Sequence, residues 1–368
     1  MNSNDIDEPY IGGADRGIRG GIVRGGEHGR RFTPTLDLMA RSPLTLAALA
    51  TSAVAGLDVT AASRHGSPEG RFDAAALVTR DGQRLLIKVP RTQTAETQAS
   101  ADLIALRALS AGVRGRLPFA APTALGQAPV SGTRAVVYDL LPGANVALDQ
   151  IVAGSSLAAS IGRAISAIHE LPTSFIADTG LSVVRPLDAL AAAVTVMDQS
   201  VATGLVPAAL VVRWENATED PTLWQFAPTV IHGAIAGSSL LTDGDRVTGV
   251  LDWHSLSAGD PARDLVWVLG ANSSAGADSV FDAYTEARGS TDRQVKKRAM
   301  LYAELEIAKW LLHGTKERST EIVDDAVAML HNLVDVVQHD STRRIDSNTS
   351  PVMTVAEVEE MLDRKNHQ

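Results

Sequence analysis

Several residue types that support common chemistries are missing or scarce. There is no cysteine, which excludes disulfides, thiolate zinc sites, iron–sulfur clusters and cysteine nucleophiles. Aromatic residues are only 4% of the chain, so the core must be built from Ala, Leu, Val and Ile. Lys and Arg number 33 against 43 Asp and Glu, for a net charge of −10. Because a general nucleic-acid coat needs a surplus of positive charge, we predict no nucleic-acid partner.

Long apolar runs are also absent. The longest, residues 43–57, is interrupted by Thr and Ser and is shorter than the roughly 18 residues that span a bilayer. The opening residues, MNSNDIDEPY, are acidic and polar, unlike a signal peptide. Together with the lack of cysteine, these features predict a cytoplasmic protein with no membrane partner.

The length and the glycine distribution indicate how the chain is divided. At 368 residues it exceeds one hydrophobic core, and we expect two packed units plus tails. Residues 12–31 hold eight glycines and five arginines with few large apolar side chains. We therefore predict a disordered tail over 1–35. An Arg–Gly tract can also bind RNA, but the acids Asp15 and Glu27 favour a plain linker.

Residues 36–145 are predicted to form a β-rich lobe. Ser42 and Pro43 are typical of the start of a helix. The pair Asp81-Gly82 is typical of a hairpin turn. The expected strands are 56–63, 72–79, 83–89 and 134–141, and the expected helix is 97–110.

Residues 146–339 are predicted to form a helical lobe, because apolar residues there recur every three or four positions. The expected helices are 157–171, 186–203, 205–217, 292–317 and 319–339, with one β-like stretch at 229–251. We interpret residues 340–368 as a polar linker that ends in a short helix near 355–364. Ligands prefer clefts between domains, so the join between the lobes is the predicted site.

Three charged residues suggest phosphate chemistry. Lys88 stands at the end of a predicted strand, where it can neutralise phosphate charge, and Asp102 lies on the following helix. Glu96 is a rival to Asp102, but it belongs to a different face of that helix. Asp252 follows a buried strand and is a candidate ligand for Mg²⁺, which prefers oxygen. A turn at Asp243-Gly244 should form a hairpin that brings Ser239 near Asp252.

These residues occur within motifs that resemble a known family. The segments Ile87-Lys-Val-Pro-Arg91, Ala167-Ile-His-Glu-Leu-Pro172 and Leu251-Asp-Trp253, followed by Gly259-Asp-Pro-Ala-Arg-Asp-Leu265, carry the resemblance. The chain resembles the kinase-like small-molecule phosphotransferases of aminoglycosides, choline and especially macrolides. The resemblance implies a two-lobed α+β fold, with a five-stranded antiparallel sheet and a helix in the small lobe. It also implies ATP or GTP as cofactor, bound with Mg²⁺.

The same resemblance assigns roles to individual residues. Lys88 and Asp102 match the phosphate-binding lysine and its acidic partner, and Asp252 matches a metal ligand. The hinge strand would meet the nucleotide base with Tyr138, Asp139 and Leu140. His232 and Asp264 match residues that brace the active loop.

The active loop departs from the family at two positions. The usual pattern is His-Gly-Asp-Leu-x-x-x-Asn, with His in the last place in many macrolide enzymes. The Asp accepts the proton of the substrate hydroxyl or orients that hydroxyl, and the Asn or His helps hold Mg²⁺. Ala234 stands at the place of Asp, and Ser239 stands at the metal-ligand position. General base catalysis contributes about 10²–10⁴-fold. We therefore interpret the chain as a degenerate, pseudokinase-like member with impaired or lost catalysis.

Alternatives remain open at this stage. The chain could be an active phosphotransferase that uses His254 or Asp260 as a substitute base. It could also bind a nucleotide or drug without catalysis, or act as a protein-interaction module through its C-terminal helix. The resemblance implies a macrolide or an aminoglycoside as the acceptor. The sequence identifies neither the individual acceptor nor the oligomeric state. Acids that could meet a cationic sugar amine, or be plain solvated charges, are Asp188, Asp198, Glu215, Glu219, Glu304 and Glu306.

Overall fold

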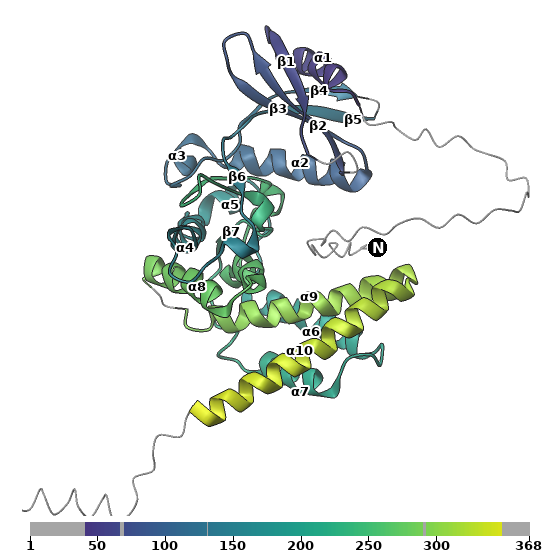
Figure 1. Ribbon diagram of the computed structural model, residues 1–368, viewed down its shortest axis with the longest axis vertical. Coiled ribbons are helices and arrows are strands. Elements are labelled where there is room, and N and C mark those ends of the chain that lie inside the picture. Colours follow the sequence, from purple (N-terminus) through teal and green to yellow (C-terminus); the bar gives the residue numbers. More distant parts are fainter. Residues whose placement is uncertain (1–40, 67–69, 131, 290–291, 348–368) are drawn as a thin grey trace, which may run out of the picture. The chain divides into compact units, whose positions relative to one another are not determined.

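A computed structural model of the protein describes residues 41–66, 70–130, 132–289 and 292–347 (Figure 1). By the density of its contacts, the chain forms two units. Of the described residues, those from 41 to 192 and from 221 to 303 belong to the main unit, and those from 193 to 220 and from 304 to 347 belong to the helical unit. The described residues of the predicted β-rich lobe all lie in the main unit, whereas those of the predicted helical lobe are divided between the two units. The predicted tail 1–35 and the short helix near 355–364 lie outside the described residues.

The first part of the main unit is a five-stranded antiparallel sheet in the order β1-β2-β3-β5-β4 (Figure 1). Its strands are β1 (Val59–Arg64), β2 (Phe72–Thr79), β3 (Arg84–Pro90), β4 (Ala124–Val130) and β5 (Thr133–Asp139). The predicted five-stranded sheet is confirmed. The sequence did not locate β4, because this mostly exposed edge strand contains Gly126 and Pro129.

Helix α1 (Pro43–Ala53) packs on one face of the sheet. The Ser42 hydroxyl accepts a hydrogen bond from the backbone of Thr45 at 3.1 Å, which confirms the predicted helix start. The buried residues of this aliphatic core include Leu46, Ala50, Leu77, Leu85, Ile87, Val89 and Val137. Because alternate residues of a strand point to opposite faces, Lys88 faces away from α1. Helix α2 (Gln93–Ala108) lies on that other side (Figure 1).

The remainder of the main unit is mostly helical. Its elements are α3 (Ala111–Arg114), β6 (Ala144–Asn145), η1 (Leu148–Gln150), α4 (Ser156–His169), α5 (Ser174–Asp178), β7 (Thr229–Ile231), η2 (Gly237–Ser239), β8 (Leu240–Thr242), β9 (Val247–Val250), η3 (Trp253–Ser255), β10 (Ser257–Gly259), η4 (Pro261–Gly270) and α8 (Ser274–Arg288). Helices α6 (Pro186–Val201) and α9 (Val295–Glu317) begin here and continue into the helical unit.

Helices α4 and α8 pack closely against each other, and a glycine makes this possible. A β-carbon on Gly162 would lie 2.4 Å from the Val280 carbonyl oxygen and 2.7 Å from the Tyr284 nitrogen. The sequence analysis missed α8, whose first turn, Ser-Ala-Gly-Ala, lacks large apolar residues. Its buried residues, among them Val280, Phe281 and Tyr284, come later in the helix.

The β-like stretch 229–251 contains the predicted hairpin. Strands β8 and β9 pair antiparallel, with Leu240 opposite Val250, and the Asp243-Gly244 turn joins them. The backbone N–H of Leu251 donates to the Ser239 carbonyl at 2.8 Å. The hairpin prediction is confirmed, and Ser239 and Asp252 are thereby brought to one end of the hairpin.

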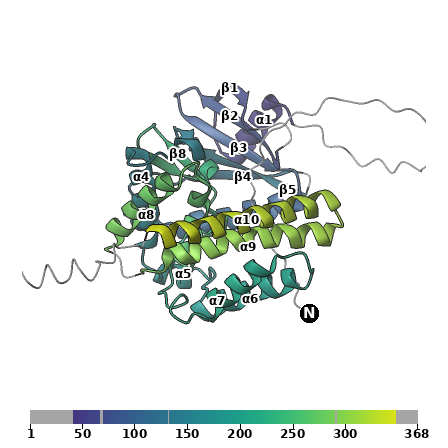
Figure 2. The same cartoon turned by 60° about the horizontal axis from the view of Figure 1, so that its bottom comes forward.

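The helical unit contains the end of α6, α7 (Ala208–Glu219), the end of α9 and α10 (Thr320–Ser347). Helix α10 runs back along the end of α9 (Figure 2), where the Trp310 indole donates to Asp325 at 2.9 Å. Contrary to the predicted linker, α10 continues past residue 339 to Ser347. The reason is that the first helix-breaking residue after α10 is Pro351.

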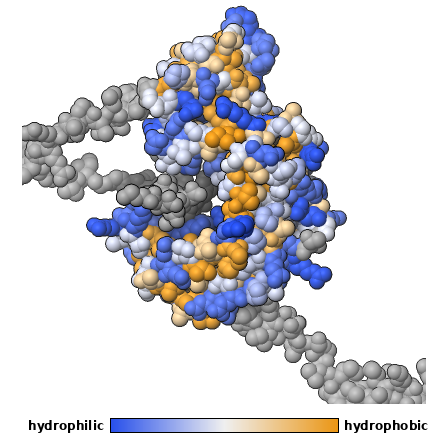
Figure 3. Space-filling model, turned by 180° about the vertical axis from the view of Figure 1, so that it is seen from behind, coloured by the Kyte–Doolittle hydropathy of each residue, from blue (hydrophilic) through white to orange (hydrophobic). Residues whose placement is uncertain are grey.

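Hydrophobic and hydrophilic residues are interspersed on the surface in Figure 3. Exposed large apolar side chains in the main unit include Leu44, Ile104 and Leu125. Scattered residues of this kind are ordinary on a protein surface. Within the described part of the chain, no helix combines the length and apolarity that crossing a membrane requires.

Candidate nucleotide site

Lys88 and Asp252, which are 164 positions apart in the sequence, meet in the main unit. The Lys88 Nζ atom lies 3.4 Å from Asp252 Oδ1. The two side chains are 29% and 46% exposed, so a solute can reach both. The rings of Phe72 and Tyr138 lie 5.8 and 6.0 Å from the ammonium group. The structure thus brings together two residues to which the sequence analysis gave separate roles in phosphate and metal binding.

The backbone of Asp252 is left-handed, with φ 61° and ψ 55°. This conformation costs a non-glycine residue about 1–2 kcal/mol, and Asp and Asn tolerate it best. Strain of this kind concentrates at functional sites. Burial favours a raised pKa for the Asp252 carboxyl, but the charges of Lys88 and His254 outweigh it and hold the pKa below its usual value. Asp252 is therefore an anion at neutral pH.

Asp102 contacts the turn that follows Asp252 rather than Lys88. Its Oδ1 atom accepts a hydrogen bond from the backbone N–H of Trp253 at 2.8 Å. Among the described residues, Lys88 forms its ion pair with Asp252, and none joins it to Asp102 within 4 Å. Burial raises the pKa of Asp102 to about 6, with the charge of Lys88 opposing the rise and Asp252 adding to it. Asp102 thus ties α2 to η3.

The rival acid, Glu96, has other partners. It pairs with Arg134 at 3.0 Å and also accepts a hydrogen bond from the Thr133 hydroxyl. Both partners belong to β5 at the far end from Tyr138. Of the two acids on α2, Asp102 is therefore the one beside the site.

Asp264 holds the start of the loop that begins at His232. It is fully buried, and its two carboxylate oxygens accept hydrogen bonds from the backbone N–H groups of His232 and Gly233, both at 2.7 Å. His169 Nε2 lies 3.1 Å from the same carboxylate, and His169 Nδ1 lies 2.9 Å from the Tyr284 hydroxyl. Burial favours a raised pKa for Asp264, but the bond with His169 and the loop amides outweigh it and lower the pKa.

His232 links this loop to the strand before Asp252. Its Nε2 lies 2.9 Å from the Leu251 carbonyl oxygen, which can only accept, so Nε2 carries the proton. Its Nδ1 then accepts from the backbone N–H of Ala234 at 3.3 Å. Burial, as the largest effect, lowers the pKa of His232, which keeps the ring neutral. His232 therefore acts as a loop brace.

Gly233 is required by both conformation and space. Its φ is +81°, in the region that favours glycine. A β-carbon there would lie 2.5 Å from the Ser255 carbonyl oxygen. The His-Gly pair of the loop is thus fixed by packing, independently of any chemistry at the next position.

The two positions that depart from the family offer few ligand atoms. Ala234 has only a methyl group as its side chain. The buried Ser239 hydroxyl donates to the Ala236 carbonyl at 2.8 Å and accepts from the Ala236 N–H at 3.0 Å. The turn thus uses the proton of the hydroxyl and one of its two acceptor lone pairs, which holds Ser239 in place within the loop.

The side chains around Asp252 supply one carboxylate for Mg²⁺, where the resembled family pattern supplies two ligands. Mg²⁺ requires near-ideal octahedral oxygen coordination and gives up its waters reluctantly. Asp252 is a single carboxylate, and Lys88 already balances its charge. In the described residues, no cluster of three or more His, Asp or Glu side chains is arranged to hold a metal ion. The sequence-based expectation of a Mg²⁺ site at Asp252 and Ser239 therefore lacks a second ligand.

The hinge strand supplies fewer free backbone donors than expected. The N–H of Asp139 donates to Thr123 at 3.1 Å, and the N–H of Leu140 donates to Arg84 at 2.9 Å. Over the described residues, no hydrogen bond is recorded for the N–H of Leu141. The sequence analysis did not single out Leu141, whose only signal is its place before Pro142.

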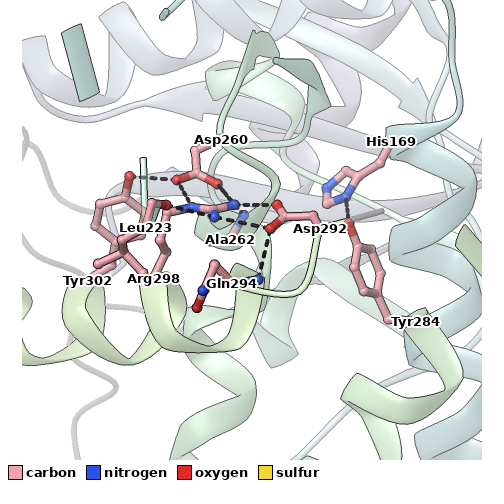
Figure 4. Close-up of polar contacts among 9 residues, drawn as sticks. All are labelled: His169, Leu223, Asp260, Ala262, Tyr284, Asp292, Gln294, Arg298 and Tyr302. Atoms are coloured by element: carbon pink, nitrogen blue, oxygen red, sulfur yellow. Dashed lines mark hydrogen bonds and ion pairs between the residues drawn. The ribbon is translucent and has the colours of Figure 1, made fainter. Parts of the chain in front are cut away.

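A buried ion-pair network that the sequence analysis missed supports the loop after β10 (Figure 4). Arg298 on α9 is fully buried and donates to Asp260 at 2.7 and 3.0 Å. It also pairs with Asp292 and donates to the Leu223 carbonyl at 3.0 Å, while the Tyr302 hydroxyl donates to Asp260 at 2.8 Å. Burial favours a lowered pKa for Arg298, but the two carboxylates outweigh it and raise the pKa.

This network excludes Asp260 as a substitute base. The side chain is 1% exposed, and it caps η4 through the Ala262 N–H at 2.9 Å. With Arg298 and Tyr302 on the same carboxylate, no oxygen is left for a substrate. Of the two substitutes considered, only His254 remains beside Asp252.

Three of the acids considered for a cationic acceptor have partners within the chain. Glu304 accepts from Arg213 at 2.8 Å and from the Trp214 indole at 2.9 Å. Asp188 pairs with Arg185 at 2.9 Å. Glu306 pairs with Lys309 at 2.6 Å. These pairs favour structural roles for Glu304, Asp188 and Glu306.

Comparisons with known proteins agree with this geometry. Residues 68–301 match the phosphotransferase enzyme family (APH). The uncharacterized protein YcbJ of Bacillus subtilis (strain 168) is 24% identical over 261 residues, which are 67% of this chain and 84% of that protein.

Two solved structures show the same fold. The macrolide 2′-phosphotransferase MphH from Brachybacterium faecium, as apoenzyme, has a TM-score of 0.63 at 22% identity and covers 78% of this chain and 98% of its own. The GDP complex of aminoglycoside 2′-phosphotransferase-IIIa has a TM-score of 0.64 at 16% identity, covering 79% and 98%. These likenesses confirm the predicted two-lobed, kinase-like α+β fold.

Proposed function

The chain belongs to the phosphotransferase enzyme family, and from this premise we propose that it binds a purine nucleotide but transfers phosphate poorly or not at all. The observation that carries the proposal is the meeting of Lys88 and Asp252 beside an active loop whose base position is Ala234. The binding half of the site is present, and the proton-accepting half is missing.

Lys88 is the proposed phosphate contact. Its ammonium group is partly exposed and lies 3.4 Å from Asp252, longer than the 2.7–2.9 Å or so of a strong charged hydrogen bond. A phosphate oxygen can therefore compete for it. The hinge, Tyr138 to Leu140, would receive the base, and Leu141 adds a backbone donor that no acceptor in the described residues takes. The GDP complex of a structural relative supports a nucleotide, with ATP and GTP both open for this chain.

The impaired catalysis follows from a loop that is held in place but lacks its base. Asp264 and His232 fix the loop through four hydrogen bonds of 2.7 to 3.3 Å. Because this frame is intact, the deficit lies in the side chains that the loop carries, namely Ala234 at the base position and Ser239 at the metal-ligand position. A missing general base costs about 10²–10⁴ in rate, or about 3–5 kcal/mol. Phosphoryl transfer depends mainly on positioning and charge, so residual activity is compatible with the proposal.

A second candidate is an active enzyme with His254 as the base. One observation favours it: His254 is close enough to Asp252 for its charge to lower the pKa of that carboxyl. The proposed acceptor class in either case is a macrolide or aminoglycoside, as for the structural relatives. The remaining candidate is a non-catalytic role, in which the protein binds a drug or another protein. For each of these candidate functions we propose that the protein acts in the cytoplasm.

The test is a gain of function at position 234. Ala234→Asp restores a base, whereas the matched control Ala234→Asn adds the same volume without one. Transfer of labelled phosphate from ATP and GTP to water, macrolides and aminoglycosides is measured for both variants. We expect Ala234→Asp to exceed wild type by about 10²–10⁴-fold and Ala234→Asn to equal it. A wild-type rate equal to that of Ala234→Asp would contradict the proposal and favour His254.

A further inference from the structure

We infer that the nucleotide taken by this site is the metal-free one, and that Asp252 is a counter-ion that competes for Lys88 rather than a Mg²⁺ ligand. The inference rests on the proposed nucleotide function and adds to it the form of the ligand and the role of one carboxylate. It comes from a mismatch: the fold family implies a Mg²⁺ ion, but the loop of this chain offers fewer oxygen ligands than such an ion would have in that family.

The first step concerns the oxygen atoms that the loop can offer. Ser239 uses its hydroxyl to close the turn with Ala236, both as donor and as acceptor. Releasing it would break both bonds and leave the N–H and carbonyl groups of Ala236 without these partners. Ala234 adds no oxygen. Mg²⁺ would thus depend on Asp252 and the nucleotide phosphates alone, which is one protein ligand fewer than the pattern of the family supplies, at a carboxylate that is already paired with Lys88.

The second step concerns the charge on Asp252. Its Oδ1 atom lies 3.4 Å from Lys88 Nζ. Its left-handed backbone conformation sets the direction in which the side chain leaves the chain. Asp102 on α2 accepts a hydrogen bond from the Trp253 N–H at 2.8 Å and, among the described residues, forms no ion pair with Lys88 within 4 Å. Lys88 and Asp252 are therefore each other's partner in the nucleotide-free protein.

The third step is the exchange that binding would require. A phosphate oxygen that pairs with Lys88 must displace Asp252, and the freed carboxylate then repels the phosphate. Neutralising Asp252 removes both the competitor and the repulsion, so it should strengthen metal-free binding. If Asp252 were a metal ligand, the same change would weaken binding. The sign of one substitution thus separates the two roles.

Asp252→Asn is suited to this test. Asn has the size of Asp and tolerates the left-handed conformation, with φ 61°, that position 252 requires. Lys88→Met is the matched control, because it keeps the length of the side chain and removes the charge. Circular dichroism and thermal unfolding of each full-length variant establish that the variants are folded.

Binding is measured by calorimetric titration of the full chain with ADP and GDP, in MgCl₂ and in EDTA. For the nucleotide that binds, we expect wild-type Kd values within about twofold in the two buffers. In EDTA, Asp252→Asn should bind about two- to fivefold more tightly, and Lys88→Met about 10- to 100-fold more weakly. Restoring both loop positions with Ala234→Asp and Ser239→Asn should make binding depend on Mg²⁺.

Two results would overturn the inference, and only the second would also contradict the proposed nucleotide function. Binding that tightens by about tenfold or more in MgCl₂ and weakens in Asp252→Asn would make Asp252 a metal ligand and leave the proposed nucleotide function intact. No binding of ADP or GDP by folded wild-type protein in either buffer would remove the nucleotide function itself.

Discussion

Substituting Asp102 by Asn tests the least expected contact of the site, because it should make the protein more stable. Asn keeps an oxygen that can accept the hydrogen bond from the Trp253 N–H, which now measures 2.8 Å. It also removes a charge that is buried on α2 next to the like charge of Asp252. Burial is the main reason that the pKa of Asp102 rises from 3.8 to about 6.

The size and direction of the effect follow from the two pKa values. Below pH 3.8, Asp102 is protonated in both the folded and the unfolded chain, and its stabilising contribution is complete. As the pH rises through about 6, the unfolded state has already lost its proton and the folded state loses it last, so this contribution disappears. The difference between 3.8 and about 6 corresponds to about 3 kcal/mol. Allowing for a weaker hydrogen bond to Asn, we expect a gain of about 1–3 kcal/mol at pH 8.

The assay is urea unfolding of wild type and Asp102→Asn at several pH values between 4 and 8. The advantage of the variant should be greatest at pH 8 and shrink toward pH 4. Glu96→Gln is the matched control, since Glu96 lies on the same helix but pairs with Arg134 at 3.0 Å and should lose stability when neutralised. An Asp102→Asn protein that is less stable than wild type at pH 8, or a difference that ignores pH, would refute the reasoning.

Two further predictions concern packing in the main unit. Arg298→Met should cost about 3–5 kcal/mol in the free energy of unfolding, because it leaves the buried Asp260 without its cation, and denaturant unfolding measures the loss. The exposed neighbour Arg293 is the control, and equal effects of the two substitutions to Met would contradict the role of the network. Gly162→Ala should cost about 1–3 kcal/mol, since its methyl group would lie 2.4 Å from the Val280 carbonyl. Thermal unfolding checks this against Gly112→Ala, where the nearest atom is 4.0 Å away, and a Gly162→Ala protein as stable as wild type would rule out the close contact.

The elements that the sequence predicted well are those whose signals are local. Ser42-Pro43 marks the start of α1, and Asp243-Gly244 joins β8 and β9, because caps and turns depend on a few neighbouring residues. Strand β4 is mostly exposed, and helix α8, although capped by Ser273 and Gly289, has few large apolar residues in its first turn. Packing against elements distant in sequence helps to place both, namely α1 for the strand and α4 for the helix.

The same contrast holds within the site. The convergence of Lys88 and Asp252 was predictable, since the order of motifs matches a family whose fold brings them together. That Asp102 meets the Trp253 N–H instead of Lys88 was not predictable, because the turn that carries this N–H lies 151 positions away in the sequence and only folding brings it to α2. The closure of the Ser239 hydroxyl onto Ala236 also depends on how the turn folds.

The sequence by itself determined the family, the sheet-plus-helix architecture and the presence of Ala234 where the family pattern has Asp, because residue identity and order are enough for each. Only the tertiary structure decided the partners of the charged groups. It removed Asp260 from the candidate bases by burying it with Arg298, and it paired Asp252 with Lys88. The physical reason is that a charged group takes its role from the atoms within about 4 Å, and folding supplies those atoms from distant parts of the chain.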